Sequence, residues 1–474
     1  MVTSTTPRPP AANKTPGDEL AEALFRLIGW LLMAAARLVW WAILFPMLSL
    51  PAALSIYLTV ADGLRAGALT AVAAIAALVL WRLVGAASFR AAITTRIQAR
   101  WRRWAVYTRW WAARCALHGL TATLDGNTLV PRLSKVRIGA VQDVLTVRML
   151  VGQTLTDWSE QADAFAHTFG VRSVTATSAS RGMVTITLHR RDLLANPILV
   201  PVPSAATVVR LDAVTIGVAE AGEPWTIPVL GRHLLVAGAT GAGKGSVLWS
   251  ILTGVAPAIR AGLVSVWMID PKGGMEFGAG AALFSRFSYD TGENTVTLLR
   301  DAAAVLTDRA GRLRGTARQH TPTVAEPLIL LAIDELAALT AYMTDRKIRT
   351  EVEQLLGLVL SQGRAVGVCV IACVQDPSKE VLALRQLFPT RIGLRLTEAT
   401  QVAMVLGLSA RERGALCDLI PDSQPGVGYM AEDGTATLTR ARAFQVTDAD
   451  IDRLAKTFAP PEPGTPAAVI DPAH

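Results

Sequence analysis

Two uncharged and mostly apolar stretches stand out near the N-terminus. Residues 38–61 carry no charged side chain, and residues 66–81 form a second such run. The first run is long enough to cross a hydrocarbon core of about 30 Å, because a helix rises about 1.5 Å per residue. Arg82 can snorkel to the interface and lengthen the second run by a few residues. The pattern predicts a transmembrane hairpin over residues 38–88, with a polar turn at residues 62–65.

Proline and the distribution of charge bear on this prediction. Pro46 and Pro51 lie inside the first run, where kinks are tolerated by membrane helices. The alternative is a buried pair of hydrophobic helices in a soluble protein. Eight arginines lie between Arg82 and Arg114, while residues 63–124 contain no Asp or Glu. Because basic segments stay on the cytoplasmic side, this asymmetry favours a cell-membrane protein with two spans and with both termini cytoplasmic.

The segments that flank the hairpin have their own composition. Residues 1–17 are rich in Pro, Thr and Ala, which is typical of a disordered tail. Residues 27–36 are apolar but too short to span, and they fit an interfacial helix, so residues 1–37 form one N-terminal segment. Tryptophans alternate with arginines in residues 89–119, as expected of a basic juxtamembrane helix on an anionic leaflet.

A small α/β module is expected over residues 120–196. Residues 144–149 alternate like a strand, Thr156 can cap a helix that ends at Phe169, and two further short strands follow at residues 174–177 and 183–188. This module shows no evident chemistry. Three prolines mark the linker that follows it: Pro197, Pro201 and Pro203.

Residues 197–446 alternate between short apolar runs and helical stretches. Continuous apolar strands between helices indicate a parallel sheet that is covered on both faces. The expected strands are residues 234–237, 264–269, 328–333, 368–373 and 391–396, and the expected helices are residues 246–255, 295–314, 349–362 and 398–406. A short helix at residues 449–458 and a Pro-rich tail make up the remaining segment, 447–474.

Composition excludes several classes of protein. Mean hydropathy is +0.37 and half of the residues are hydrophobic, which is too apolar for a disordered chain. The four cysteines are too few and too scattered for a disulfide scaffold, and the six histidines are too dispersed for a His-based metal site. The eight arginines equal the net charge of +8, so charge alone does not mark the C-terminal part as a nucleic-acid binder.

A glycine-rich loop follows the first strand of the C-terminal part. Its spacing is G-x-x-x-x-G-K between a strand and a helix, where glycines let backbone N–H groups cradle a polyphosphate and Lys244 reaches the β- and γ-phosphates. A simple glycine turn in a strand–turn–helix unit is the alternative. The expected cofactor is ATP, held by Gly238, Ala239, Thr240, Gly241, Ala242, Gly243, Lys244, Gly245 and Ser246.

The loop departs from the usual pattern at one position. Gly245 stands where a Ser or Thr hydroxyl normally binds Mg²⁺. Ser246 follows, but one helical step is about 100° of rotation, so Ser246 cannot simply take over. Either the helix begins in another register or water completes the metal shell.

Two carboxylates end a buried strand about 90 residues after the loop. Asp334 is expected to hold Mg²⁺, directly or through water, and Glu335 to polarise the attacking water. The alternative is a pair of helix-capping carboxylates. Asp270-Pro271-Lys272 closes the strand between the two motifs, and Gln375 ends the next strand, where it could sense a γ-phosphate or be a loop residue without a role.

These residues together resemble the FtsK/SpoIIIE family of DNA translocases. The matching stretches cover about residues 200–430, and the two-segment anchor is most similar to the plasmid-transfer (Tra) branch of actinomycetes. The stretches are Ala221 to Pro224, Leu234 to Lys244, Asp270 to Lys272, Ile333 to Glu335, Gly363 to Gly367, Gln375 and Pro389 to Ile392.

The resemblance implies a RecA-like P-loop ATPase that assembles as a homo-hexameric ring and pumps double-stranded DNA through its centre. It also implies that Arg364 is an arginine finger for a neighbouring subunit's ATP, although a surface arginine or structural ion pair is the alternative. Gly245, the shortened membrane domain and the lack of a C-terminal winged-helix module depart from the family.

Three functions therefore remain open. The first is a membrane-anchored DNA pump for conjugative plasmid transfer or chromosome partitioning, with other transfer proteins as partners. The second is an FtsK-like ATPase of a protein secretion system, although such motors usually carry several ATPase domains and this chain shows one. The third is a membrane scaffold with a degenerate site, for which Gly245 is the support.

Overall fold

The computed structural model describes residues 16–377, 384–435 and 437–461. The chain divides into two compact units, residues 1–121 and 122–474. The expected tail at residues 1–17 lies almost wholly outside the described residues.

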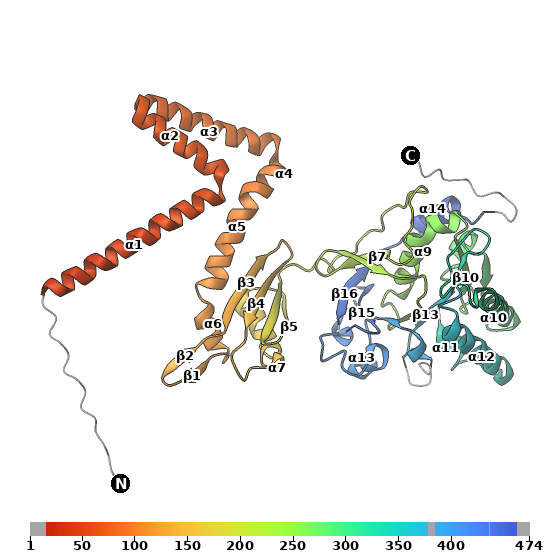
Figure 1. Ribbon diagram of the computed structural model, residues 1–474. Coiled ribbons are helices and arrows are strands. Elements are labelled where there is room, and N and C mark those ends of the chain that lie inside the picture. The colour runs from red at the N-terminus through yellow and green to blue at the C-terminus, as the bar shows by residue number, and fades with distance from the viewer. Residues whose placement is uncertain (1–15, 378–383, 436, 462–474) are drawn as a thin grey trace, which may run out of the picture. The chain divides into compact units, whose positions relative to one another are not determined.

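Three helices form most of the first unit (Figure 1). They are α1 (Pro16–Leu44), α2 (Pro46–Asp62) and α3 (Leu64–Val84). The chain leaves the helical conformation at Phe45, because a residue before proline is disfavoured in the α region. The uncharged run of residues 38–61 is therefore divided between two helices, and the prediction of one kinked segment was wrong. Pro46 begins α2, while Pro51 lies inside it.

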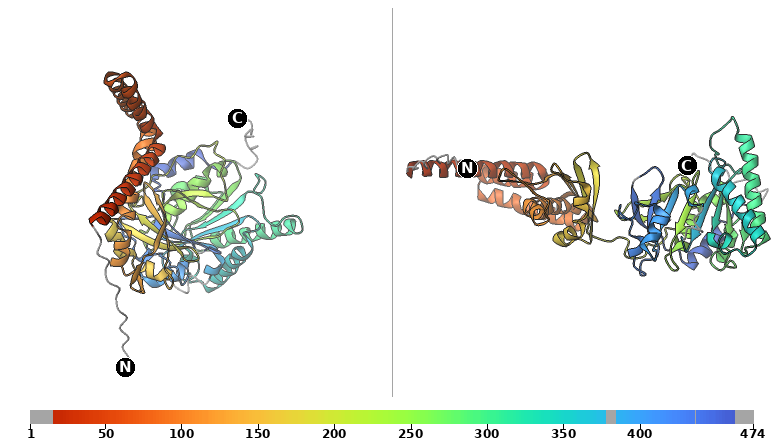
Figure 2. Two further views of the ribbon diagram at one scale, coloured as in Figure 1. Left: turned by 60° about the vertical axis from the view of Figure 1, so that its left-hand side comes forward. Right: turned by 90° about the horizontal axis from the view of Figure 1, so that it is seen from below.

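Helices α2 and α3 fold back against each other, as Figures 1 and 2 show. Gly63 joins them with a φ of 90°, which favours glycine. Gly67 is buried at the contact, and a Cβ there would overlap the Thr59 hydroxyl. The backbones thus approach as closely as small-residue contacts between membrane helices do.

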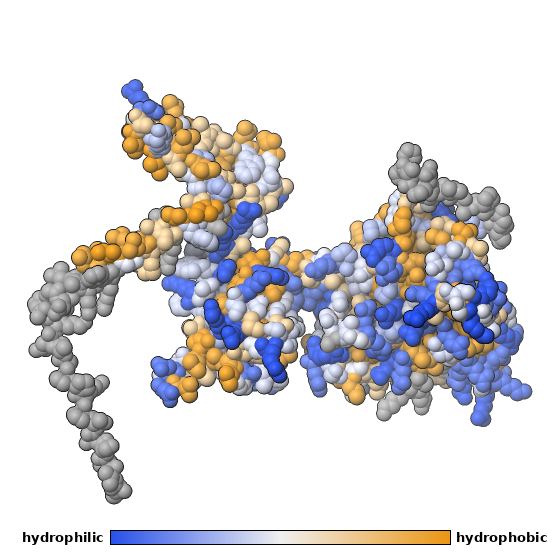
Figure 3. All heavy atoms as spheres, in the orientation of Figure 1, coloured by the Kyte–Doolittle hydropathy of each residue, from blue (hydrophilic) through white to orange (hydrophobic). Residues whose placement is uncertain are grey.

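Only α3 is long and apolar enough to cross a membrane among the helices of the described residues. Helix α2 is apolar but shorter, with 17 residues, and residues 27–36 within α1 form another short apolar stretch. Large hydrophobic side chains such as Leu54, Val60 and Leu83 are exposed on these helices. Apolar residues cover much of their surface in Figure 3. A two-span hairpin therefore remains a proposal.

The basic stretch after α3 is helical, with two π-helical turns. Arg109 lies over the rings of Trp104 and Trp110, with 5.4 and 5.1 Å between the guanidinium carbon and the ring centres. The segments are α4 (Ala86–Phe89), η1 (Arg90–Thr94), α5 (Thr95–Arg102), η2 (Arg103–Thr108) and α6 (Trp111–Leu117).

The small module contains an antiparallel sheet with the strand order β3-β4-β6-β5. Trp158, Phe165 and Phe169 stack in its core, and Gly170 ends the second helix in the left-handed conformation. The expected single helix is two, and three strands were not foreseen. The elements are β1 (Ala122–Leu124), β2 (Asn127–Leu129), β3 (Arg132–Ile138), β4 (Gln142–Arg148), α7 (Leu155–Ser159), α8 (Ala162–Phe169), β5 (Ser173–Ser180) and β6 (Met183–His189).

A ten-stranded sheet with the order β11-β10-β12-β13-β9-β14-β15-β16-β7-β8 forms the large domain. The first six strands are parallel, as expected, whereas the other four pair antiparallel and make the sheet mixed. The strands are β7 (Val214–Ala219), β8 (Pro224–Ile227), β9 (Leu234–Ala237), β10 (Val264–Ile269), β11 (Arg286–Ser288), β12 (Leu328–Ile333), β13 (Val368–Val374), β14 (Thr390–Gly393), β15 (Val427–Glu432) and β16 (Leu438–Ala443).

Helices bury both faces of this sheet. In β9, Leu234 and Val236 belong to one apolar cluster, with α9 and α14, while Leu235 and Ala237 belong to the other, with α10, α12 and α13. This explains why the parallel strands are continuously apolar. The helices are α9 (Lys244–Arg260), α10 (Glu293–Leu313), α11 (Leu336–Leu339), α12 (Arg346–Gln362), α13 (Ala399–Leu406) and α14 (Asp448–Thr457), with 3₁₀ turns η3 (Gly278–Leu283), η4 (Arg385–Leu387) and η5 (Cys417–Leu419).

Candidate nucleotide-binding site

The glycine-rich loop lies at the carboxyl edge of the parallel strands. It connects β9 to α9, and Gly241 and Gly243 have φ angles of 75° and 95°, which side chains rarely adopt. The loop is fastened at its start, because Gly238 N–H donates to the Val374 carbonyl and Ala239 N–H to the Arg395 carbonyl. A wrapped loop on a rigid base is the geometry that phosphate binding needs.

Neighbouring segments hold the far side of the loop. The Ala242 carbonyl accepts the Gly426 N–H, and a Cβ on Gly243 would overlap that same nitrogen. The Arg395 guanidinium donates to the Thr240 carbonyl at 2.7 Å. The sequence analysis did not single out Arg395, because its contact depends on β14 lying beside β9.

Lys244 points its ammonium group back into the loop. Its Nζ donates to the Gly238 carbonyl at 2.7 Å and to the Ala239 carbonyl at 3.3 Å. The side chain is buried, and this burial lowers its pKa. An ammonium held by loop carbonyls is ready to exchange them for phosphate oxygens, which would compensate its charge better.

Asp334 and Glu335 follow β12 at the same edge, and both are buried. Lys272, from the loop after β10, donates to Asp334 Oδ2 at 2.8 Å. Although desolvation opposes it, this contact raises the pKa of Lys272, helped by the Glu335 and Asp270 charges. The structure therefore brings together the strand-end carboxylates and the Asp270-Pro271-Lys272 motif.

Glu335 makes contacts through one carboxylate oxygen. Its Oε1 accepts the backbone N–H of Ala337, which caps the short helix α11, and the N–H of Gln375 at 3.3 Å. The capping alternative thus describes part of the role of Glu335, and the backbone of Gln375 lies beside this carboxylate, while γ-phosphate sensing by Gln375 stays a prediction. Oε2 is buried and has no hydrogen-bond partner among the residues that the structure describes, and burial raises the pKa of the carboxyl group. This free oxygen is available to a water molecule or proton.

A carboxylate from another loop lies beside Gly245, the residue after Lys244. A Cβ built on Gly245 would overlap Oε1 of Glu276, whose charge also interacts with that of Asp334. Helix α9 begins at Lys244 with Gly243 as its N-cap, so Gly245 is the second residue of the helix and Ser246 the third. The sequence analysis did not identify Glu276 as a candidate site residue. Two acidic side chains beside a phosphate-binding loop fit a Mg²⁺ ion that enters with nucleotide phosphates.

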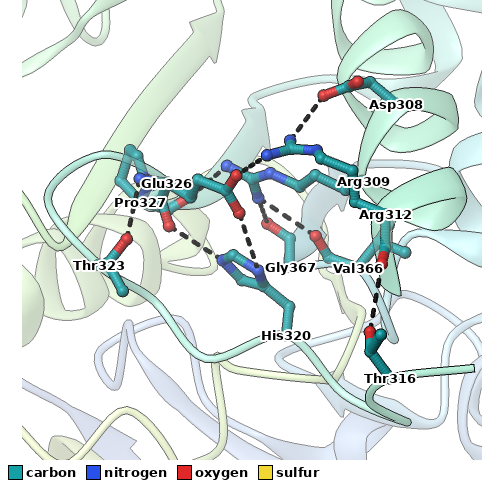
Figure 4. A network of polar contacts seen from close by, with 10 residues as sticks. All are labelled: Asp308, Arg309, Arg312, Thr316, His320, Thr323, Glu326, Pro327, Val366 and Gly367. Carbon is teal, nitrogen blue, oxygen red and sulfur yellow. Dashed lines mark hydrogen bonds and ion pairs between the residues drawn. The ribbon is translucent and has the colours of Figure 1, made fainter. Parts of the chain in front are cut away.

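Arg364 lies at the opposite edge of the sheet, in the loop before β13, and is exposed. Figure 4 shows what holds this loop. The buried Arg309 donates to the Val366 and Gly367 carbonyls at 3.2 and 3.1 Å, and to the Pro327 carbonyl at 2.7 Å. His320 N–H donates to the Ala365 carbonyl. Arg364 therefore lies at the other end of the parallel strands from the glycine-rich loop, and hydrogen bonds hold the backbone of the residues that follow it.

A depression of about 680 Å³ accompanies Arg364 at this edge. Two further arginines line it, Arg314 and Arg318, from the segment after α10. Such a basic depression suits an anionic group that comes from outside the subunit.

A family model described as the FtsK/SpoIIIE family matches residues 206–411. Those residues form an FtsK/SpoIIIE domain. Every candidate residue named above lies inside it, from Gly238 to Gln375. A second model, the actinomycete conjugal transfer protein N-terminal domain, matches residues 70–190. The resemblance drawn from the sequence is confirmed.

Two relatives are similar to this chain at about a quarter identity. Transfer protein TraSA of Streptomyces ambofaciens is 26% identical over 387 residues, which are 76% of this chain and 89% of that protein. DNA translocase FtsK of Borreliella burgdorferi is 26% identical over 203 residues, 38% of this chain and only 24% of that protein. The chain thus contains an FtsK/SpoIIIE domain and is similar to a transfer protein and to a DNA translocase.

Two solved structures are similar to this chain at low identity, with TM-scores below 0.5. The conjugation coupling protein TcpA of pCW3, a monomer form with ATPγS, has a TM-score of 0.47 and 19% identity, covering 73% of this chain and 98% of that one. The cytoplasmic domain of the type VII secretion ATPase EccC of Thermomonospora curvata has a TM-score of 0.43 and 22% identity, covering 57% of this chain and 34% of that one.

Proposed function

We propose that this chain is a membrane-anchored, ATP-driven translocase of double-stranded DNA that serves conjugative plasmid transfer. The observation that carries the proposal is the meeting of Lys244, Asp334 and Glu335 at one sheet edge of an FtsK/SpoIIIE domain. The conjugal-transfer domain ahead of it supports transfer rather than chromosome partitioning as the process.

Each residue of the site has a part in ATP hydrolysis. The backbone N–H groups of residues 238–246 and the Lys244 ammonium bind the β- and γ-phosphates. Asp334 and Glu276 are the residues that would hold Mg²⁺, which neutralises phosphate charge when bound. Glu335 orients the attacking water and takes its proton on Oε2, and its raised pKa suits it to accept one. Gln375 holds the other Glu335 oxygen in place through its backbone N–H.

Arg364 completes the site of a neighbouring subunit. It lies at the amino ends of the parallel strands, whereas its own phosphate-binding loop lies at their carboxyl ends. It therefore reaches a nucleotide only if the amino-end side of one subunit faces the carboxyl-end side of the next. A repeated contact of this kind closes into a ring when the rotation allows it. A planar guanidinium then offsets the charge that develops on the γ-phosphate.

The N-terminal helices are the membrane anchor. Helix α3 meets the length and hydropathy of a membrane span, and α2 packs against it as the second, shorter arm. Arginines follow α3 directly, which fits a cytoplasmic exit from the bilayer. The motor, the juxtamembrane helix and both termini then share the cytoplasmic side.

The test is ATP hydrolysis by the full chain in detergent, with and without linear duplex DNA. A DNA motor is supported if duplex DNA stimulates turnover severalfold. This stimulation should fall steeply as salt is raised, because the protein binds the phosphates of the DNA backbone. The matched control is Lys244→Ala, which should not turn over. Turnover that ignores DNA but responds to a secreted protein would instead place the chain among secretion ATPases, and the absence of any turnover would contradict the proposal altogether.

A further inference from the structure

The first turn of α9 is covered by the loop that follows β10. Trp249 lies one turn below Gly245, on the same face of the helix. The Phe277 ring stacks on the Trp249 ring, with 5.1 Å between centroids and 23° between planes. A Cβ on Gly280 would overlap the Trp249 ring, so the loop packs against this face without a gap. The residue just before Phe277 is therefore held at the level of Gly245.

A buried carboxylate fixes the path of this loop from inside. Asp270 is fully buried, and its Oδ2 accepts the backbone N–H groups of Glu276 and Phe277, both at 3.1 Å. Its Oδ1 accepts the Lys272 N–H at 3.2 Å. Three hydrogen bonds to one ionised acceptor make a tight turn, and charge-assisted bonds of this kind are among the stronger ones. The backbone of Glu276 is thus set by the protein and not by a ligand.

The Glu276 side chain occupies the room that Gly245 leaves. Its Oε1 atom lies 2.2 Å from the position that a Cβ at residue 245 would take, closer than real Cβ contacts allow. Glu276 as a whole is exposed, so solvent and small ions can reach it. Because a Ser or Thr hydroxyl at this position normally reaches the metal, a carboxylate oxygen in the same place lies within the region from which a ligand is supplied.

We propose that Glu276 replaces the missing hydroxyl as the protein's ligand to the nucleotide-bound Mg²⁺, directly or through one water molecule. The inference rests on the proposed ATPase function. A carboxylate is a hard oxygen donor that Mg²⁺ prefers, and one or two such groups are what Mg²⁺ usually takes beside substrate phosphates.

The electrostatics agree with a cation at this point. Partial desolvation and the charges of Asp334 and Asp270 raise the pKa of Glu276, against the opposing effect of Lys272 and Lys244. The Asp334 carboxylate is thus near enough for its charge to act on Glu276. A divalent cation would relieve the repulsion between these two carboxylates, as bound cations often dominate the charge balance of such sites.

The test measures how Mg²⁺ changes nucleotide binding, without any turnover. The full chain in detergent binds a fluorescent, non-hydrolysable ATP analogue while Mg²⁺ is titrated, and the same binding is measured in EDTA. The variants are Glu276→Ala, Gly245→Ser and the double variant, and the control is Glu353→Ala, an exposed glutamate on α12.

Glu276→Ala should raise the Mg²⁺ concentration for half-maximal enhancement about tenfold or more. Binding in EDTA should stay within about twofold of the parent, because the phosphate-binding loop is intact. The double variant should recover most of the Mg²⁺ response, since the Ser hydroxyl then fills the vacated space. Glu353→Ala should match the parent.

An unchanged Mg²⁺ response in Glu276→Ala would overturn the inference, and so would a double variant that responds no better than Glu276→Ala. The proposed ATPase function fails in a different way. In that case, the parent chain binds no nucleotide under either condition.

Discussion

Lys272 Nζ lies 2.8 Å from Asp334 Oδ2, so the loop after β10 supplies the cation that balances the carboxylate at the end of β12. The Asp334 side chain is only 4% exposed, whereas the Lys272 side chain is 43% exposed. Solvent can therefore reach the lysine and not the carboxylate. The pair joins two neighbouring strands at the edge where the phosphate-binding loop lies.

Removing this cation should destabilise the nucleotide-free protein. Lys272→Met leaves a buried carboxylate without its partner, which costs about 1 to 3 kcal/mol. The measurement is the thermal unfolding midpoint of the full chain in detergent, with and without Mg²⁺ and nucleotide, which should recover part of the loss. The control is Lys456→Met, whose ion pair with Asp452 is exposed on both sides and contributes little. Equal shifts in the two variants would contradict the expectation.

Glu335→Gln should bind ATP but hydrolyse it at least about a hundredfold more slowly, because a general base contributes that much or more. Since burial raises the pKa of Glu335, turnover of the parent should fall with acidification at a pH above the ordinary glutamate value of 4.5. On the acidic limb of the pH–rate profile the Glu335 carboxylate is protonated, so it can no longer accept a proton from the attacking water. The measurement is a pH–rate profile together with nucleotide binding. Hydrolysis by Glu335→Gln at the parental rate would show that another group is the base.

Arg364→Ala should lose about a thousandfold or more in turnover while its own nucleotide binding stays intact. Mixing it with Lys244→Ala should restore some activity to two inactive preparations, because each mixed contact pairs a working loop with a working arginine. Arg364→Lys should remain poor, since a lysine lacks the planar fork of donors. Arg349→Ala, an exposed arginine on α12, is the control. If the turnover of Arg364→Ala stays within about twofold of the parent, Arg364 is not an arginine finger.

The membrane topology can be read with introduced cysteines. The four native cysteines are buried, so they should stay silent towards an impermeant maleimide. Asp62→Cys, at the turn between α2 and α3, should be labelled from outside intact cells. Arg137→Cys, on β3, should be labelled only after the cells are opened. Labelling of both positions, or of neither, in intact cells would contradict the two-span hairpin.

Most of the parallel half of the sheet was predictable because its central strands are buried on both faces, whereas the short edge strand β11 was not predicted. Strands β9, β10 and β12 match their predicted ranges to the residue, and β13 differs by one. The antiparallel half was missed, because β16 mixes Thr and Arg with Ala and pairs with β7 more than 200 residues earlier. Such pairing leaves no local mark on the sequence.

The candidate site shows the same division. Asp334, Glu335 and Gln375 come directly after apolar strands, and Lys244 ends the glycine-rich loop that follows one, so adjacency along the chain was enough to find them. Glu276 lies in the middle of a loop, and its position beside Gly245 depends on hydrogen bonds to Asp270 and on packing against α9. The helix break at Phe45 was missed for another reason, since an uncharged run does not record where backbone conformation changes.

The separation of Arg364 from the phosphate-binding loop has a consequence for the living cell. With Arg364 acting in trans, a solitary copy holds two halves of different catalytic centres and completes neither. ATP consumption then follows how often copies meet within the plane of the bilayer, rather than how many copies are synthesised. Scattered copies would leave the cell's energy supply almost untouched, and the motor would begin to spend it only where enough of them had gathered.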